Sequence, residues 1–280
     1  MSRTIYHYTD SNALIGILTH KKLWLNDVQF MNDRDEVFDS LNTIKDLLEI
    51  NQDSSFLKNF YEYATYHCYA SGVPSLQNHG HMIASFCRES DILEMWRGYG
   101  NSGQKYCIGF DADVLHKCAI QTFGSRHICL VDCLYDENEK REELQEYFDE
   151  SNSSSHGFEE LFTLLLSMKN KGFSNEQEVR LIGLFNYRNE AEHKTLKHRS
   201  SPMGIIPYRE IELKCVDERP LIKEIMIGPT EYKEQCESAV DSLLYYSHHL
   251  SLQANDSDNP CLFNTPEEVQ INHSKISFRR

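Results

Sequence analysis

The chain has 280 residues, of which 40% are hydrophobic and 25% charged, and its formal net charge is −15. This composition is that of a globular protein with a sizeable core, and the acidic balance argues against bulk binding to a nucleic-acid backbone. The sequence holds neither a run of about 18 apolar residues nor an apolar leader, so we expect no membrane partner. Nine cysteines without a C-x-x-C pair argue against structural zinc, and we expect reduced thiols in the cytoplasm.

The first 36 residues are typical of a strand, a helix, a second strand and a polar loop. The first strand holds Tyr6-His7-Tyr8-Thr9, and Asp10 or Ser11 can cap the helix that follows it. The apolar stripe of this helix is predicted to consist of Leu14, Ile15 and Leu18. The second strand covers residues 23–25, and the polar loop covers 30–36.

Helical and strand patterns alternate through the rest of the chain. They predict helices over 37–48, 56–64 and 90–99, strands over 82–87, 106–110 and 129–134, and an acidic stretch over 136–160 that forms a solvated helix and a mobile loop. Beyond it they predict a helix over 162–168, a hairpin pairing 178–185 with 203–208 and 211–213, a strand over 221–227 and a helix over 230–247. No repeat or linker divides the chain, so we predict one α+β domain over 1–280, with a mixed, mostly antiparallel sheet flanked by helices.

Four polar clusters stand at the ends of these predicted elements, where side chains converge on a cleft. They are His7 with Thr9; Asn32, Asp33 and Glu36; Arg88 with Trp96, Arg97 and Tyr99; and Glu176, Glu178 and Arg180. Each has a structural alternative: His7 can fill a hydrogen bond at a strand edge, and Trp96 fits the core. Tyr99, between two glycines, can face a ligand.

Glu176 and Glu178 are two residues apart at a strand start, so both are expected to point to one face, with Arg180 beside them. Carboxylates held by an arginine can bind a ribose diol or stabilise a developing cation. They fit a cross-strand ion pair at a sheet edge equally well. Nucleophile-elbow, phosphate-loop and dinucleotide-binding motifs are missing, and the spacing of the acidic residues gives no signal for a metal site.

A series of motifs resembles one bacterial family, domain-of-unknown-function family 2971, some members of which carry abortive-infection labels. The motifs are Tyr6-His7-Tyr8-Thr9, Leu23-Trp24-Leu25, Asn32-Asp33 with Glu36, Ser85-Phe86-Cys87, Met95-Trp96 with Tyr99-Gly100, Gly109-Phe110-Asp111, Glu176 with Glu178 and Arg180, Ile206-Pro207-Tyr208, and Ile225 with Ile227-Gly228-Pro229. The resemblance covers about residues 5 to 230. It departs at Arg34, where the family usually has proline, and in the acidic insert.

More remotely, the first 25 residues resemble ADP-ribosyltransferases that carry a His–Tyr–Glu triad. This resemblance implies that Glu178, His7 and Tyr99 are catalytic: Glu178 would stabilise an oxocarbenium ion formed from NAD, His7 would hold a ribose, and Tyr99 would stack on nicotinamide. It also implies a cofactor-binding set of Thr9, Arg180, Asn32, Arg97 and Glu176, in which Arg180 meets the pyrophosphate or only orients Glu178. The mapping requires His7 and Glu178 on adjacent strands facing one cleft, within about 10 Å.

The leading hypothesis is therefore an ADP-ribosyltransferase-like or NAD-cleaving enzyme of bacterial phage defence, with NAD as substrate and a protein or nucleic-acid acceptor engaged locally. The alternative is a binding module without turnover that recognises a nucleotide or a partner protein, as an antitoxin or sensor does. A metal-dependent nuclease is the third hypothesis, and no ligand spacing supports it.

Overall fold

The computed structural model describes residues 3–30, 35–50, 54–65, 79–98, 103–124, 128–148, 157–186, 189–201, 204–253 and 261–277. Its strands are β1 (Thr4–Asp10), β2 (Lys22–Asp27), β3 (His79–Cys87), β4 (Lys105–Asp111), β5 (Ile128–Asp132), β6 (Glu178–Asn186), β7 (Lys197–Ser201), β8 (Gly204–Glu212), β9 (Ile222–Ile227) and β10 (Gln270–His273). Its α-helices are α1 (Ser11–His20), α2 (Asp35–Ile50), α3 (Ser55–Thr65), α4 (Leu93–Gly98), α5 (Ala112–Phe123), α6 (Glu137–Gln145), α7 (Gly157–Ser167), α8 (Glu190–His193) and α9 (Lys233–Gln253). Short 3₁₀ turns are η1 (Val28–Phe30), η3 (Glu146–Phe148), η5 (Lys171–Glu176) and η6 (Pro266–Glu268).

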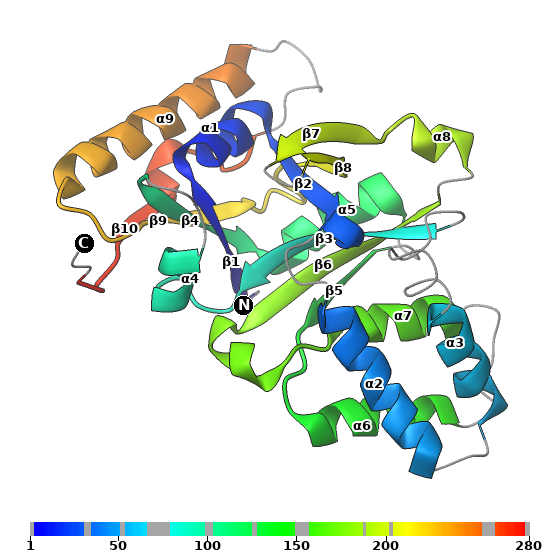
Figure 1. Ribbon diagram of the computed structural model, residues 1–280. Coiled ribbons are helices and arrows are strands. Elements are labelled where there is room, and N and C mark those ends of the chain that lie inside the picture. The colour runs from blue at the N-terminus through cyan, green and yellow to red at the C-terminus, as the bar shows by residue number, and fades with distance from the viewer. Residues whose placement is uncertain are drawn as a thin grey trace.

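The described strands form one sheet of ten strands, in the order β10-β9-β4-β1-β3-β2-β8-β7, with β6 joining β3 to β5. The pairings between them are antiparallel except that of β9 with β10. Helices flank this sheet (Figure 1), so the structure confirms the predicted α+β class and the mixed, mostly antiparallel sheet.

The sheet forks at β3. Along one edge β3 pairs with the whole of β6, whereas its other edge is shared by two strands. There β1 pairs through Tyr6 with Cys87, and β2 pairs with Met82 and Ile83. Away from these contacts β1 pairs with β4 and β2 pairs with β8, so the β3 residues between the two contacts lie beside a gap that separates β1 from β2.

Two apolar layers cover the two faces of the sheet. On one face, Ile5, Phe86 and Val179 belong to a core that includes residues of α1, α5 and α9. On the other face, Ile83 and Ile182 pack with residues of α2, α3 and α7, and Tyr8 and Cys87 pack with α4. Figure 1 shows α1 and α9 on one side and α2, α3, α6 and α7 on the other.

The N-terminal helix shows why one predicted core position is wrong. Of the two predicted cap candidates, Asp10 and Ser11, the structure uses Asp10, which accepts a hydrogen bond from the Ala13 amide at 2.9 Å. The buried residues are Leu14, Ile17 and Leu18, whereas Ile15 is 48% exposed. Steps of three and four residues from Leu14 reach Ile17 and Leu18, so Ile15 falls on the outer face.

The predicted hairpin between 178–185 and 203–213 is also wrong. β6 pairs with β3 and β5, while β8 pairs with β2 and β7. Four helices and strands remained unpredicted: α5, which Asp111 caps, α8, β7, and β10, which adds the polar C-terminal region to β9. Local pattern identifies a strand, but partner choice depends on residues far away in the chain.

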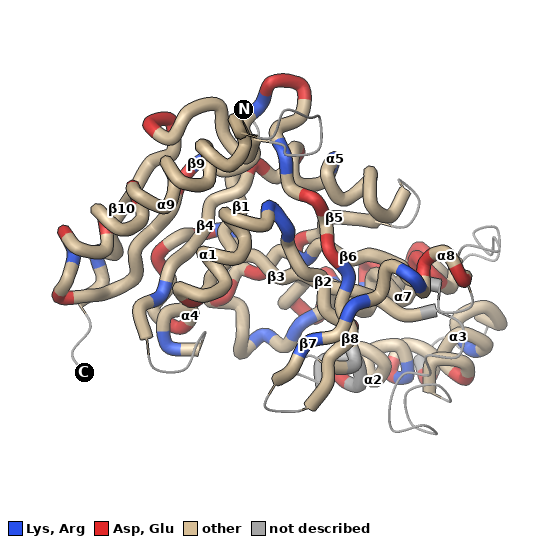
Figure 2. Tube along the Cα trace, turned by 90° about the horizontal axis from the view of Figure 1, so that it is seen from above, with Lys and Arg blue, Asp and Glu red and all other residues tan. Residues whose placement is uncertain are grey.

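Acidic and basic residues are interspersed along the Cα trace (Figure 2). Within the described residues, no helix is both long and apolar enough to cross a membrane.

Candidate functional site

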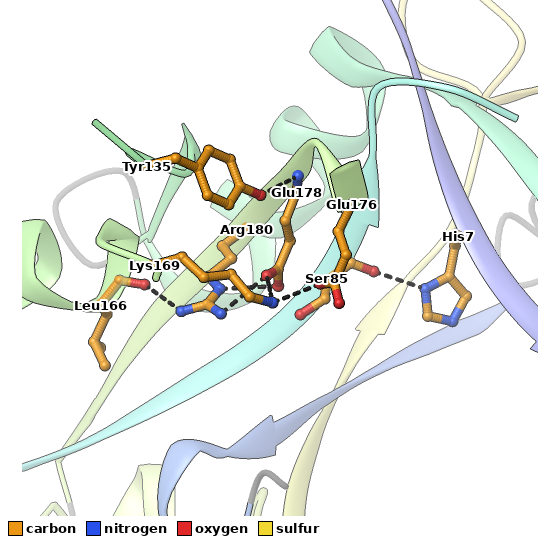
Figure 3. Close-up of polar contacts among 8 residues, drawn as sticks. All are labelled: His7, Ser85, Tyr135, Leu166, Lys169, Glu176, Glu178 and Arg180. Carbon is orange, nitrogen blue, oxygen red and sulfur yellow. Dashed lines mark hydrogen bonds and ion pairs between the residues drawn. The ribbon is translucent and has the colours of Figure 1, made fainter. Parts of the chain in front are cut away.

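Glu178 opens β6 opposite Cys87 of β3, and its carboxylate is the centre of a buried charge cluster (Figure 3). Oε1 accepts a hydrogen bond from Arg180 Nε at 2.9 Å, and Oε2 accepts one from Arg180 Nη2 at 3.0 Å. Lys169 Nζ lies 2.8 Å from Oε2 of Glu178 and 2.6 Å from Oε2 of Glu176. Two carboxylates therefore face two cations.

The cluster is tied to the surrounding backbone. Arg180 Nη1 donates to the Leu166 carbonyl at the end of α7, at 2.7 Å, and the Glu178 amide donates to the Tyr135 hydroxyl at 2.8 Å. Glu178, Arg180 and Lys169 are 5%, 3% and 8% exposed, so their charges are desolvated and depend on each other. Burial alone raises the pKa of Glu178, but attraction by Arg180 and Lys169 outweighs it and lowers that pKa to about 2.

The space beside Glu178 is small. A pocket of about 10 Å³ is lined by Tyr6, Tyr8, Ser85, Phe86, Cys87, Met95, Glu176 and Glu178. Such a volume holds about one water molecule and excludes a ribose. The buried Ser85 hydroxyl oxygen on its wall has no hydrogen-bond partner among the described residues, which fits a water site. Because no ligand of ribose size can reach Glu178, we assign the charge cluster a structural role. It connects the start of β6 to the end of α7 through the bond from Arg180 to the Leu166 carbonyl.

His7 does not face this cluster, so the expected single cleft is wrong. Tyr6, Cys87 and Glu178 are directly paired across β1, β3 and β6, which puts their side chains on one face of the sheet. His7 follows Tyr6 and points to the other face, where its ring packs against Phe86 at 5.6 Å between centroids.

His7 instead donates a hydrogen bond to the backbone at the fork of the sheet. Its Nδ1 lies 3.0 Å from the carbonyl oxygen of Ser85, beside the gap between β1 and β2 (Figure 3). A carbonyl can only accept, so Nδ1 carries the hydrogen. Burial lowers the pKa of His7, which favours the neutral ring.

The remaining predicted site residues are dispersed. Thr9 is buried on the same face of β1 as His7, and Arg97 is exposed on α4. Glu176 ends η5 rather than lying on β6, and it meets Glu178 only through Lys169. Asn32, Asp33 and Tyr99 lie outside the described residues, as does the side chain of Glu36. Among the described side chains, no group of three or more His, Cys, Asp or Glu is arranged to hold a metal ion.

A much larger pocket, of about 880 Å³, lies where α4, the start of β4, the start of α9 and the C-terminal segment meet. Volumes of about 300–1,000 Å³ are typical of small-molecule sites. We call it the α9 pocket; it is lined by Trp96, Gly103, Gln104, Lys105, Pro229, Thr230, Glu231, Tyr232, Lys233, Ser274, Lys275, Ile276 and Ser277.

The α9 pocket carries positive charge although the chain is acidic. Its charged lining residues are three lysines, Lys105, Lys233 and Lys275, and one glutamate, Glu231. The three lysines form no ion pair with any residue that the structure describes. Lys105 Nζ donates to the Trp96 carbonyl, and burial lowers the pKa of Lys105.

Trp96 forms a rigid wall of this pocket. It is 3% exposed, as predicted for a core residue, and its ring meets Tyr8 edge-on at 4.7 Å between centroids. A Cβ added to Gly228 would lie 3.0 Å from Trp96 Cε3 and 3.0 Å from the Lys105 carbonyl oxygen. The absence of a side chain at residue 228 therefore lets β9 end directly against Trp96.

Sequence reasoning did not single out the three lysines, because each stands in a different part of the chain. The sequence feature that could have indicated the pocket is the Ile227-Gly228-Pro229 motif, which precedes α9 and borders the pocket. The C-terminal wall had no signal, since residues 261–277 lack a clear apolar pattern.

The fold and these sites define an α+β protein with a structural charge cluster and a separate ligand-sized pocket. Residues 95–181 match the model of a family described as a protein of unknown function (DUF2971), and this description names no activity. The matched span runs from α4 to the first half of β6 and includes Trp96, Lys105 and the Glu178 cluster. No curated protein and no solved structure matches the chain.

Proposed function

We propose that this chain is a binding module for a small anionic ligand of nucleotide size, and that the α9 pocket is its binding site. The observation that carries the proposal is the set of three lysines without ion-pair partners in the described structure, around a pocket of about 880 Å³, in a chain of net charge −15. Unpaired cations that converge on one pocket favour a ligand that brings its own negative charge.

The lining suits a nucleotide in particular. Lys233 and Lys275 are exposed enough to turn toward a phosphate, while Lys105 is held nearer the wall by its bond to the Trp96 carbonyl. Tyr232, 61% exposed beside them, offers a ring on which a base can stack. Gln104 and Thr230 add polar groups that can orient a sugar or base.

Binding without turnover is better supported than NAD cleavage. A carboxylate that stabilises an oxocarbenium ion has to meet the ribose, yet Glu178 adjoins a space for about one water and is neutralised by Arg180 and Lys169. His7 occupies the other face of the sheet. The phage-defence setting rests on the resemblance alone, and efficiency of phage plating on cells expressing the chain tests it.

Calorimetric titration with ATP, AMP, NAD and adenosine tests the proposal. We expect the phosphorylated compounds to bind, adenosine to bind more weakly, and added salt to weaken binding. Lys233→Gln and Lys275→Gln should each lower affinity by about 10-fold or more, the scale of a lost hydrogen bond to a charged group. Lys45→Gln, an exposed change on α2, is the control for net charge.

Equal affinity for adenosine and ATP, or no effect of the two pocket substitutions, would contradict the proposal. Incubation with NAD distinguishes the two functions that the sequence suggested, an NAD-cleaving enzyme and a binding module. A binding module leaves NAD intact, whereas release of nicotinamide by the pure protein would restore the enzyme hypothesis.

A further inference from the structure

Asp91, in the loop between β3 and α4, contacts two walls of the α9 pocket at once. Its Oδ1 accepts hydrogen bonds from Trp96 Nε1 at 2.7 Å and from the Ser274 hydroxyl at 2.6 Å. Its Oδ2 accepts one from the Lys275 amide at 2.8 Å. One carboxylate therefore holds the tryptophan ring on one side and the C-terminal segment on the other.

The wall formed by Ser274–Ser277 has few other attachments. The Ser274 amide donates to the Ile227 carbonyl at 2.8 Å, which extends the pairing of β10 with β9. The Ile276 amide donates back to the Ser274 hydroxyl oxygen at 3.1 Å, and Ile276 packs in part against the cluster around Trp96. Beyond Ser274, among the described contacts, Asp91 supplies the hydrogen bond that ties this backbone to the rest of the molecule.

We propose that Asp91 is the positioning residue of the α9 pocket, and that it couples ligand binding to fixation of the Ser274–Ser277 segment against α4. The inference rests on the proposed function for its ligand, but the attachment itself is independent of any ligand. A ligand that contacts Lys275 and Tyr232 bridges the segment to the start of α9. It binds more tightly when the segment is already held, and it must hold the segment in return.

Two substitutions of Asp91 distinguish its contact with Trp96 from its contact with the backbone of the C-terminal segment. Asp91→Ala removes all three hydrogen bonds. In Asp91→Asn, the amide oxygen still accepts from Trp96 and Ser274, but the amide nitrogen cannot accept from the Lys275 amide. The asparagine variant therefore frees the segment's backbone while Trp96 keeps its partner. Glu94→Gln, an exposed change on α4, is the control for the lost charge.

Two measurements on the full chain test the proposal. Hydrogen exchange of peptides covering residues 270–277 reports on the segment. Emission of Trp96, isolated by Trp24→Phe because the chain has two tryptophans, reports on the ring. Without ligand, we expect exchange in both Asp91 variants to be about 10-fold faster or more, with Trp96 emission altered only in Asp91→Ala. Saturating ATP should slow exchange in the wild-type segment, and ATP affinity should fall about 10-fold in Asp91→Asn.

Unchanged exchange of the segment in both Asp91 variants would overturn the attachment. Faster exchange with unchanged ATP affinity would overturn the coupling while the proposed function stands. If the wild-type protein binds none of the nucleotides, the proposed function fails, and the exchange measurement without ligand still decides whether Asp91 holds the segment.

Discussion

His7 and Glu178 lie on opposite faces of one sheet, with strand β3 between them. The pairing of Tyr6 with Cys87, and of Cys87 with Glu178, sets this arrangement, since each strand alternates its side chains. A shift of one residue in the pairing of β1 would put His7 on the Glu178 face. The bond from His7 to the Ser85 carbonyl at 3.0 Å gives the imidazole a structural role at the fork.

His7→Ala should destabilise the fold without changing ligand affinity. The substitution leaves the Ser85 carbonyl without its partner, which costs about 1–3 kcal/mol of unfolding free energy. Urea unfolding measures this cost, and His20→Ala on the exposed side of α1 is the control. A His7→Ala protein of wild-type stability that loses ligand binding would contradict the structural assignment.

Stability should also depend on pH through His7. Burial lowers its pKa in the folded state, so the unfolded chain takes up a proton first as the pH falls. The contribution of the neutral ring is complete above the unfolded pKa of about 6.5 and is lost progressively as the pH drops below it. Urea midpoints measured between neutral and mildly acidic pH should fall less steeply in His7→Phe than in the wild type.

Glu178→Gln should be strongly destabilising, because it leaves Arg180 and Lys169 buried with one carboxylate fewer. Removing one partner of a buried ion pair lowers the free energy of unfolding by about 3–5 kcal/mol. Glu176→Gln, at a half-exposed position, should cost less, and thermal unfolding compares the two. Equal losses of stability would show that Glu178 is not the centre of the cluster.

The same cluster predicts acid sensitivity at lower pH. The pKa of Glu178 is lowered to about 2, so its contribution is present above the unfolded value of about 4.3 and disappears as the pH falls toward 2. At about 1.4 kcal/mol per pKa unit, this contribution is on the order of 3 kcal/mol. Acid unfolding followed by circular dichroism should be shallower over this window in Glu178→Gln.

Gly228→Ala should weaken ligand binding through Trp96. The new methyl group would lie 3.0 Å from the indole ring and from the Lys105 carbonyl, so the pocket wall has to shift. Overpacking of this kind costs about 1–3 kcal/mol of stability. Gly98→Ala, where an added Cβ meets nothing within 4 Å, is the matched control. Calorimetry should find reduced ATP affinity in Gly228→Ala and wild-type affinity in Gly98→Ala.

Trp96→Ala should lower stability by about 3–5 kcal/mol, the range for a large buried ring. It should also abolish ligand binding, because the ring and its Asp91 bond form one wall of the pocket. Thermal unfolding and titration of the folded variant measure the two effects. A loss below about 1 kcal/mol would remove Trp96 from the core.

Local chemistry allowed much of the fold to be predicted. The cap at Asp10, the apolar spacing in α2 and α3, and the run Tyr106–Phe110 each involve residues close in sequence, and the structure contains all of these elements. The buried position of Trp96 followed from a large apolar residue on a short helix.

The sites depended on contacts that cross the chain. The sequence by itself determined that Glu178 and Arg180 share one side of a strand, since alternation is a property of the backbone. Only the tertiary structure decided that Lys169 completes that cluster, that His7 points away from it, and that Lys105, Lys233 and Lys275 surround one pocket. The physical reason is that strand partners and register are selected by burial of the whole core, to which distant residues contribute together.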